Sequence, residues 1–153
     1  MIVADFAPVM ARQENKVIAH YRDGSLLKGT TLDFFPSKPS FHIMDEAEDV
    51  HEVLVEELKA VFFVKSFTGD PAKQERRGFF TRHTQGKKVM VEFEDGETIF
   101  GYTLSYSVKG LGFFMFPGDP DSNNAKIFIV HGATQRVKVR SLPTNYSSNH
   151  YSR

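Results

Sequence analysis

The chain of 153 residues contains no cysteine, which excludes disulfide bonds, thiolate metal sites and cysteine nucleophiles. It has no run of roughly 18 apolar residues, the length that a membrane-spanning helix requires. Its start, Met-Ile-Val-Ala-Asp-Phe, lacks the basic region of a signal peptide. We therefore expect a soluble protein without membrane insertion, and the lack of cysteine fits a reducing cytoplasm.

An excess of charge is absent as well, because 19 basic residues balance 19 acidic ones. General binding to a nucleic-acid backbone needs a positive face, since affinity comes from counterions released at several phosphates. The neutral total therefore argues against a nucleic-acid partner. The distribution is uneven, however, and residues 67–88 contain six Lys or Arg against two Asp or Glu. A small anionic ligand at this basic segment stays open.

Patterns for catalysis and metal binding are missing too. The sequence has no Gly-x-Ser-x-Gly elbow, no glycine-rich phosphate loop and no serine and histidine in a recognisable frame. Residues 119–123 begin like a calcium loop, but Asn124 stands where such a loop needs glycine, and Val130 where it needs a bidentate glutamate. The six histidines include no pair at ligand spacing with an identifiable carboxylate partner. We therefore expect no enzyme, no metal site and no cofactor.

What the chain does contain is a repeat. Residues 16–32 align without a gap with residues 88–104, and seven of the 17 positions are identical. Such self-similarity indicates a tandem duplication. The copied segment carries no reactive constellation, so the duplication favours a doubled binding module over a catalyst. Because Glu92 is the counterpart of His20, we expect the His20 side chain to be exposed.

Each copy reads as a β-hairpin. Apolar and polar residues alternate with a period of two, which is typical of strands, and each first strand runs into an Asp-Gly dipeptide that closes a tight turn. The return strands carry Gly29 and Gly101 at matching places. An interior strand glycine marks a sharp bend or a close approach of two backbones, as small barrels require. Together with the later β-type runs, this predicts about five short strands per half and little helix.

These observations predict an all-β fold of two tandem, five-stranded small barrels that pack together. The two Asp-Gly hairpins, residues 58–64 and residues 113–124 resemble an uncharacterised bacterial family of tandem Sm-like or SH3-like barrels. The predicted organisation is an N-terminal extension (1–14), a first Sm-like barrel (15–67), a basic linker (68–86), a second Sm-like barrel (87–142) and a polar tail (143–153).

The basic linker also resembles part of a PilZ domain, the bacterial receptor for cyclic di-GMP. In that family, arginines before the first strand and a Ser-x-x-Gly turn after the second enclose the ligand, because guanidinium groups bind phosphate and stack on guanine. The residues that carry this degenerate match, and hence the candidate ligand site, are Arg76, Arg77, Arg82, Ser107 and Gly110. The alternative is a solvated basic linker.

Phenylalanine is abundant, with 15 residues, several of them in adjacent pairs. In such a pair on a strand one ring faces the core and the other faces outward, so some outward rings need cover. An interface between the two barrels and an aromatic platform for a peptide or a base both stay open. The candidate interaction surface comprises Phe79, Phe80, Phe113, Asp119, Asn123 and Asn124.

We therefore predict a non-enzymatic regulatory binding module whose partner is another protein. Barrel edges and residues 113–124 offer surfaces for strand addition, and the basic segment offers selection by charge. The first alternative is a degenerate PilZ-like receptor for a cyclic dinucleotide, and the second is an Sm-like RNA binder.

Overall fold

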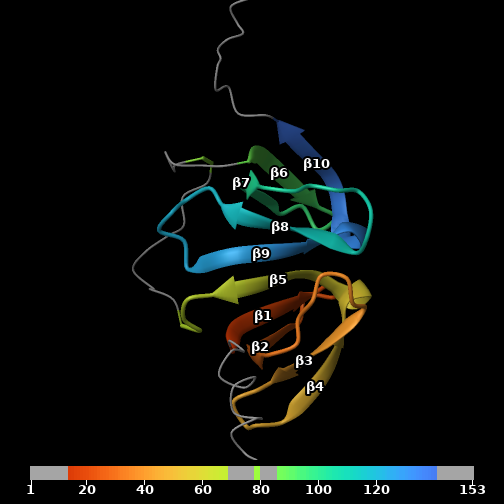
Figure 1. Ribbon diagram of the computed structural model, residues 1–153, viewed down its shortest axis with the longest axis vertical. Helices are drawn as coiled ribbons and strands as arrows, with labels where there is room; N and C mark the ends of the chain where they lie inside the picture. Colours follow the sequence, from red (N-terminus) through yellow and green to blue (C-terminus); the bar gives the residue numbers. More distant parts are fainter. Residues whose placement is uncertain (1–13, 69–77, 80–85, 141–153) are drawn as a thin grey trace, which may run out of the picture.

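The computed structural model describes residues 14–68, 78–79 and 86–140, so Arg76, Arg77, Phe80 and Arg82 lie outside the described residues. The predicted all-β fold is confirmed, with ten antiparallel strands and two single turns of 3-10 helix in the described chain (Figure 1). The first half contains β1 (Asn15–Tyr21), β2 (Leu26–Thr31), β3 (Ser40–Met44), β4 (Val50–Leu54), η1 (Val55–Glu57) and β5 (Leu58–Val64). The second half contains β6 (Lys87–Phe93), β7 (Thr98–Thr103), β8 (Gly112–Pro117), β9 (Asn124–Val130), η2 (His131–Ala133) and β10 (Thr134–Arg140).

The hairpins predicted at the two Asp-Gly dipeptides are present. Gly24 and Gly96 have positive φ angles of 95° and 96°, a conformation that glycine adopts without steric cost. In each turn the aspartate side chain accepts a backbone hydrogen bond two residues on, from Ser25 to Asp23 at 2.8 Å and from Glu97 to Asp95 at 2.9 Å. The local sequence therefore fixes both turns in the same way.

The matching strand glycines mark close backbone contacts. A Cβ atom on Gly29 would lie 2.2 Å from the carbonyl oxygen of Met44, and one on Gly101 would lie 2.1 Å from that of Phe116. No side chain fits at such distances, so only glycine allows the second strand of each half to cross the third so closely. The prediction of close approach at these two positions is confirmed.

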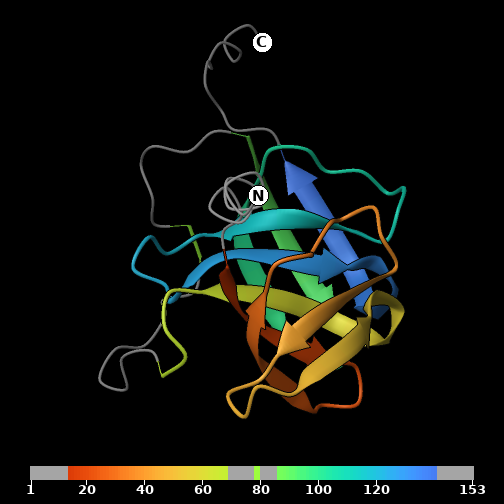
Figure 2. The same ribbon diagram turned by 60° about the horizontal axis from the view of Figure 1, so that its bottom comes forward.

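All ten strands belong to one continuous sheet, in the order β10-β6-β7-β8-β9-β5-β1-β2-β3-β4. Within each half the last strand pairs with the first, so β5 lies beside β1 and β10 lies beside β6. Both pairs carry a register shift near the start of the last strand. The two halves are joined where β5 pairs with β9 (Figure 2). By their place in each half, β10 is therefore the counterpart of β5, and β4 is the counterpart of β9.

Two hydrophobic cores lie on opposite faces of the β5 and β9 pair, and each of these strands contributes to both cores. The first core takes Val61 and Phe63 from β5 with Phe128 and Val130 from β9, whereas the second takes Ala60, Phe62 and Val64 from β5 with Ile127 and Ile129 from β9. This division follows from the alternation of side chains along a strand. Each half therefore completes the interior of the other.

Phenylalanine rings join the halves at this junction. Phe34 from the first half meets Phe114 and Phe128 from the second half, with ring centroids 5.9 and 5.1 Å apart. These edge-on contacts are the arrangement that aromatic rings prefer. The predicted packing of the two halves through phenylalanine is confirmed at this cluster.

Candidate functional site on the outer face of β10, β6 and β7

Three strands of the second half present a mixed cationic and apolar face to the outside. In the register of the sheet, Met90 lies between Lys138 of β10 and Phe100 of β7, while Lys88 pairs with Arg140. These side chains point away from the core, since their neighbours Val89 and Val91 are fully buried. The register thus gathers charges from distant parts of the chain into one patch.

The Phe79 side chain lies over this face. Its ring meets Phe100 and Tyr102 edge-on at centroid distances of 5.6 and 5.4 Å, and the ammonium group of Lys88 lies 5.0 Å from its centroid. The cation and ring attract each other through the ring's quadrupole. Phe79 is half-buried, so part of the ring remains accessible.

Gly118 accounts for the position of the segment that carries Phe79. A Cβ atom on Gly118 would lie 1.9 Å from the carbonyl oxygen of Gly78, so the two backbones touch. The Gly118 amide also donates a hydrogen bond of 3.0 Å to the carbonyl of Phe100. A glycine after β8 therefore lets residues 78–79 lie against β7.

Together these residues line an open surface cavity of about 520 Å³, a volume within the range of small-ligand sites. Its described lining consists of Phe79, Lys88, Val89, Met90, Phe100, Lys138 and Arg140. The described lining residues include three cations, so the cavity suits a negatively charged group. The described lining contains no serine, threonine, histidine or carboxylate side chain.

The same face of the first half is closed by contact with the second half. On β1, Ile18 occupies the position that Met90 occupies on β6. On β5, Phe62 and Val64 occupy the positions that Lys138 and Arg140 occupy on β10. Phe62 and Val64 are buried in the second core, and Ile18 packs against that core. One face of the repeat is therefore an interface within the chain in the first half and an open cationic surface in the second.

Ser107 and Gly110 lie away from this cavity. The Ser107 hydroxyl accepts a hydrogen bond of 3.1 Å from the amide of Lys109, and the Ser107 carbonyl accepts one of 2.7 Å from the His131 ring. His131 begins η2, the turn directly before β10, whereas Lys88 pairs with Arg140 at the other end of that strand. The structure therefore brings Phe79 to the cavity but places the Ser107 turn near the opposite end of β10.

The other proposed interaction residues have structural contacts. Phe113 is buried in the second core, where Tyr106 packs on it at 4.9 Å. Asp119 is 3 % exposed, and its carboxylate accepts a hydrogen bond of 2.9 Å from the amide of Asp121. These two side chains face the interior of the protein and contribute little to its surface.

Asn123 and Asn124 fasten the turn before β9 to the end of β5. The Asn123 side chain accepts a hydrogen bond from the Ser66 amide at 3.2 Å and donates one to the Ser66 carbonyl at 2.9 Å. Asn124 pairs with Val64 as the first residue of β9. The turn that resembles the start of a calcium loop is thus held by protein groups, and the described residues contain no cluster of three metal-ligating side chains.

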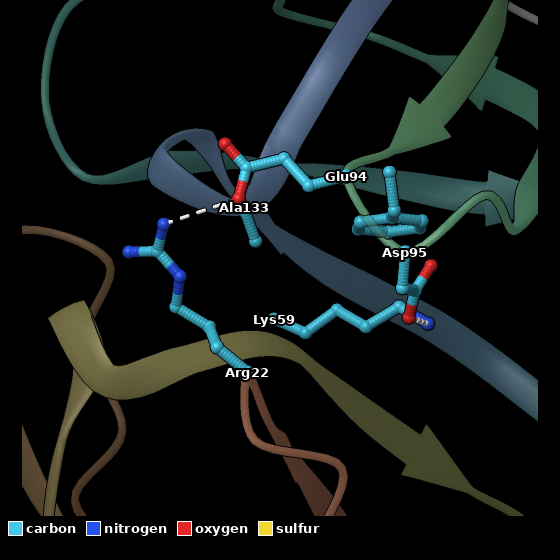
Figure 3. Close-up of a pocket in the computed structure, with 6 residues that line it drawn as sticks. Arg22, Lys59, Glu94, Asp95 and Ala133 are labelled. Carbon is cyan, nitrogen blue, oxygen red and sulfur yellow. Dashed lines mark hydrogen bonds and ion pairs between the residues drawn. The ribbon is translucent and has the colours of Figure 1, made fainter.

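A second, smaller cavity lies between the two halves and is lined by ion-paired side chains (Figure 3). Lys59 donates to the carboxylates of Asp95, at 2.7 Å, and Glu97, and its ammonium lies 4.7 Å from the Phe93 ring centroid. Arg22 donates to the Gly132 carbonyl at 2.6 Å and lies 3.4 Å from Glu94. The remaining space of about 30 Å³ accommodates little more than a water molecule. We interpret this cluster as a clamp between the halves.

One sheet built from two matching halves defines an all-β protein of internal repeats. A family model matches residues 13–141, and the chain belongs to this family, DUF6982, a family of unknown function. No curated protein and no solved structure matches the chain. In the part of the chain that the structure describes, no helix is long and apolar enough to cross a membrane.

Proposed function

We propose that this protein is a non-enzymatic binding module whose partner is another protein, held on the outer face of β10, β6 and β7. One observation carries this proposal. The counterpart of this face in the first half, formed by Ile18, Phe62 and Val64, is already a protein interface within the chain. The face that remains open in the second half has the corresponding strand pairing with different side chains.

Those side chains indicate the chemistry of the partner. Lys88, Lys138 and Arg140 favour a negatively charged segment, because complementary charges raise both the rate and the specificity of association. Phe79 and Phe100 offer an apolar recess of the kind that anchors one large side chain at an interface. The partner is therefore an acidic segment that carries an apolar or aromatic anchor.

We also infer that each half is an Sm-like or SH3-like barrel and that the protein has a regulatory role in the cytoplasm. The close backbone contacts at Gly29 and Gly101, at matching places in the two halves, support the resemblance of each half to an Sm-like or SH3-like barrel. A regulatory role in the cytoplasm is consistent with the lack of cysteine. Small scaffolds of this kind host many functions, so the open face, and not the fold, indicates a binding role.

Photo-crosslinking followed by titration tests the proposal. A photoreactive phenylalanine analogue at Met90, inside the cavity, should crosslink a protein in the native host, whereas the same analogue at exposed Leu26 of β2 should not capture that protein. The captured protein is then purified and titrated against variants. Lys138→Glu with Arg140→Glu should weaken binding by about tenfold or more, because two favourable charge contacts become repulsive.

A matched control reverses two exposed lysines of the first half. Lys16 and Lys28 lie on β1 and β2, and Lys16→Glu with Lys28→Glu alters the net charge by the same amount. Binding should change by less than about twofold in this control, since these lysines lie outside the cavity. Equal losses in the two double variants would mean that only net charge matters and would contradict a site on β10.

A cyclic dinucleotide is the second candidate ligand. The volume of about 520 Å³ and the adjacent aromatic and cationic side chains favour it, because bases stack on rings while phosphates bind cations. Calorimetry with cyclic di-GMP should then give heat that Arg140→Ala abolishes. No heat at high micromolar ligand rejects this candidate, and an absorbance ratio free of nucleic acid in the purified protein counts against an RNA partner.

A further inference from the structure

The strand β10 lies at one end of the sheet, whereas its counterpart β5 is paired on both sides. β5 pairs with β1 and also with β9, which comes from the other half. β10 pairs with β6, and no strand of the described chain lies along its other edge (Figure 1). An unpaired edge carries backbone donors and acceptors that another strand can use.

The β5 and β9 pair shows how such a strand would lie. In its register Phe128 is opposite Val61 and Ile127 is opposite Phe62, so Phe128 covers the first core from the side of β9. With β9 beside β5, the Val61 and Phe63 side chains are almost fully buried. Their counterparts on β10, Val137 and Val139, pack against the second core but are only half-buried. The second core therefore lacks the cover that β9 provides to the first.

The opposite side of β10 carries positive charge. Arg136, Lys138 and Arg140 stand in the positions that Ala60, Phe62 and Val64 occupy on β5. Arg136 lies 3.5 Å from Glu92 on β6, while Lys138 and Arg140 line the cavity. A strand added to β10 would therefore meet valines on one face and cations on the other.

We propose that β10 accepts an extended segment of the partner protein by antiparallel strand addition. The apolar side chains of this segment pack over Val137 and Val139, and acidic side chains alternate with them and face Lys138 and Arg140. This inference rests on the proposed function, since it names the form in which the acidic partner binds. Main-chain hydrogen bonds supply affinity in this mode, and the alternating side chains supply specificity.

A second copy of the chain does not meet these requirements. Its free edge is β4, the counterpart of β9, and in the register of β9 on β5 its Glu52 would lie opposite Val137 and its His51 opposite Lys138. The carboxylate would then lie on the apolar face and the imidazole among cations. A one-residue shift would turn Glu52 toward the cations, but it would place the apolar Val50 and Leu54 on that cationic face as well.

Two peptides of identical composition test the strand geometry separately from charge. The first, Glu-Val-Glu-Phe-Glu-Val-Glu, alternates acidic and apolar residues, and the second, Glu-Glu-Val-Phe-Val-Glu-Glu, groups them. Fluorescence anisotropy of labelled peptides with the full chain should give at least tenfold tighter binding of the alternating peptide. Lys138→Glu should weaken that binding by tenfold or more, and Lys28→Glu should change it by less than twofold.

Amide hydrogen exchange locates the bound peptide. The alternating peptide should slow exchange within β10 and leave β4 unchanged. Equal affinity for both peptides without protection of β10 would overturn strand addition, while the loss caused by Lys138→Glu would still support an acidic partner. Binding of neither peptide, when the crosslinked partner binds, would also overturn strand addition alone.

Sedimentation of the chain without peptide provides the remaining comparison. A monomer is the expected result. Dimers or longer assemblies that protect β10 and β4 would show that a second copy occupies the edge and would overturn the proposed partner. Protection of β10 by the alternating peptide without any crosslink at Met90 would keep strand addition and reject the partner site over the cavity.

Discussion

Replacement of Lys59 by methionine should weaken the clamp between the two halves. Methionine keeps the length and apolar stem of the lysine but removes the ammonium group, which donates to Asp95 and Glu97 and lies over the Phe93 ring. The lysine side chain is only 12 % exposed, whereas those of Asp95 and Glu97 are 54 % and 50 % exposed. Water can therefore solvate both carboxylates once the lysine is gone.

The expected loss follows from these contacts. A hydrogen bond to a charged group contributes about 1.5–3 kcal/mol and a cation over a ring about 0.5–1 kcal/mol, but solvent screening reduces the share of exposed partners. We expect Lys59→Met to lower the free energy of unfolding by about 1–2 kcal/mol, far less than the loss of one partner from a fully buried pair. For a chain of this size the change in Tm is roughly 2–8 °C.

The pH dependence of this loss distinguishes the ion pairs from simple packing. The hydrogen bond from Lys59, followed by that from the Glu97 amide, holds the pKa of Asp95 below its usual value. Its stabilisation is complete above the unfolded pKa of about 3.9 and is lost as the pH falls through the lower folded value. Burial opposes the charge of Lys59, but its hydrogen bonds to Asp95 and Glu97 outweigh burial and raise its pKa, so its stabilisation is lost only above about pH 10.4.

Urea unfolding of wild type and variant between pH 2 and pH 9 measures both quantities. The difference should be constant from about pH 5 to pH 9 and should shrink below about pH 4. Lys109→Met, at an exposed lysine of the β7 to β8 loop, is the control and should unfold like wild type. The reasoning is refuted if Lys59→Met equals wild type in stability, or if its deficit persists undiminished at pH 2.

Three further predictions concern the interior and the turns. Burial, followed by the charge of Lys59, lowers the pKa of His20. The free energy of unfolding should therefore fall from about pH 6.5 toward pH 5 as the ring is protonated, and His20→Gln should reduce this fall in urea titrations. Phe62→Ala should cost about 3–5 kcal/mol and destabilise both halves together, so melts followed by circular dichroism and tyrosine fluorescence should coincide; two separated transitions would contradict the shared core. Gly101→Ala should lower the free energy of unfolding by about 3 kcal/mol or more, because its methyl group would collide with the Phe116 carbonyl. Gly110→Ala, where a Cβ meets open space at positive φ, should lower it by about 1–2 kcal/mol. Equal losses would argue against the close contact at Gly101.

Local features of the fold were predictable because they depend on short sequence patterns. Alternating residues with Asp23-Gly24 specify a hairpin in either half, and a strand glycine such as Gly29 marks a backbone contact. The joining of the halves through β5 and β9 was not predicted, since alternation within a strand does not identify its partner. A signal existed in the unbroken apolar residues of Ala60–Val64 and Ile127–Val130, which indicate strands that are covered on both faces.

The candidate site was only partly predictable. Phe79 stood out because it adjoins basic residues in the sequence, but Lys138 and Arg140 come from the last strand and reach the cavity through the register of the sheet. Comparison of the two copies beyond the hairpin would have revealed them, since charged residues on β10 replace apolar ones on β5. His20 was expected to be exposed, yet it is half-buried with its ring 4.1 Å from Phe62, because the second half covers this face of the first.

Because β5 and β9 each contribute side chains to both cores, the chain cannot be divided between its halves without damage to both cores. If residues 1–68 and 86–153 were produced as separate polypeptides, each would have an incomplete hydrophobic core. Phe62 would lose the residues of the second half that pack around it, and Phe128 would lose those of the first half. Neither fragment should be a stable protein in isolation. Mixed together, they should recover the native sheet, as complementary halves of a split reporter do.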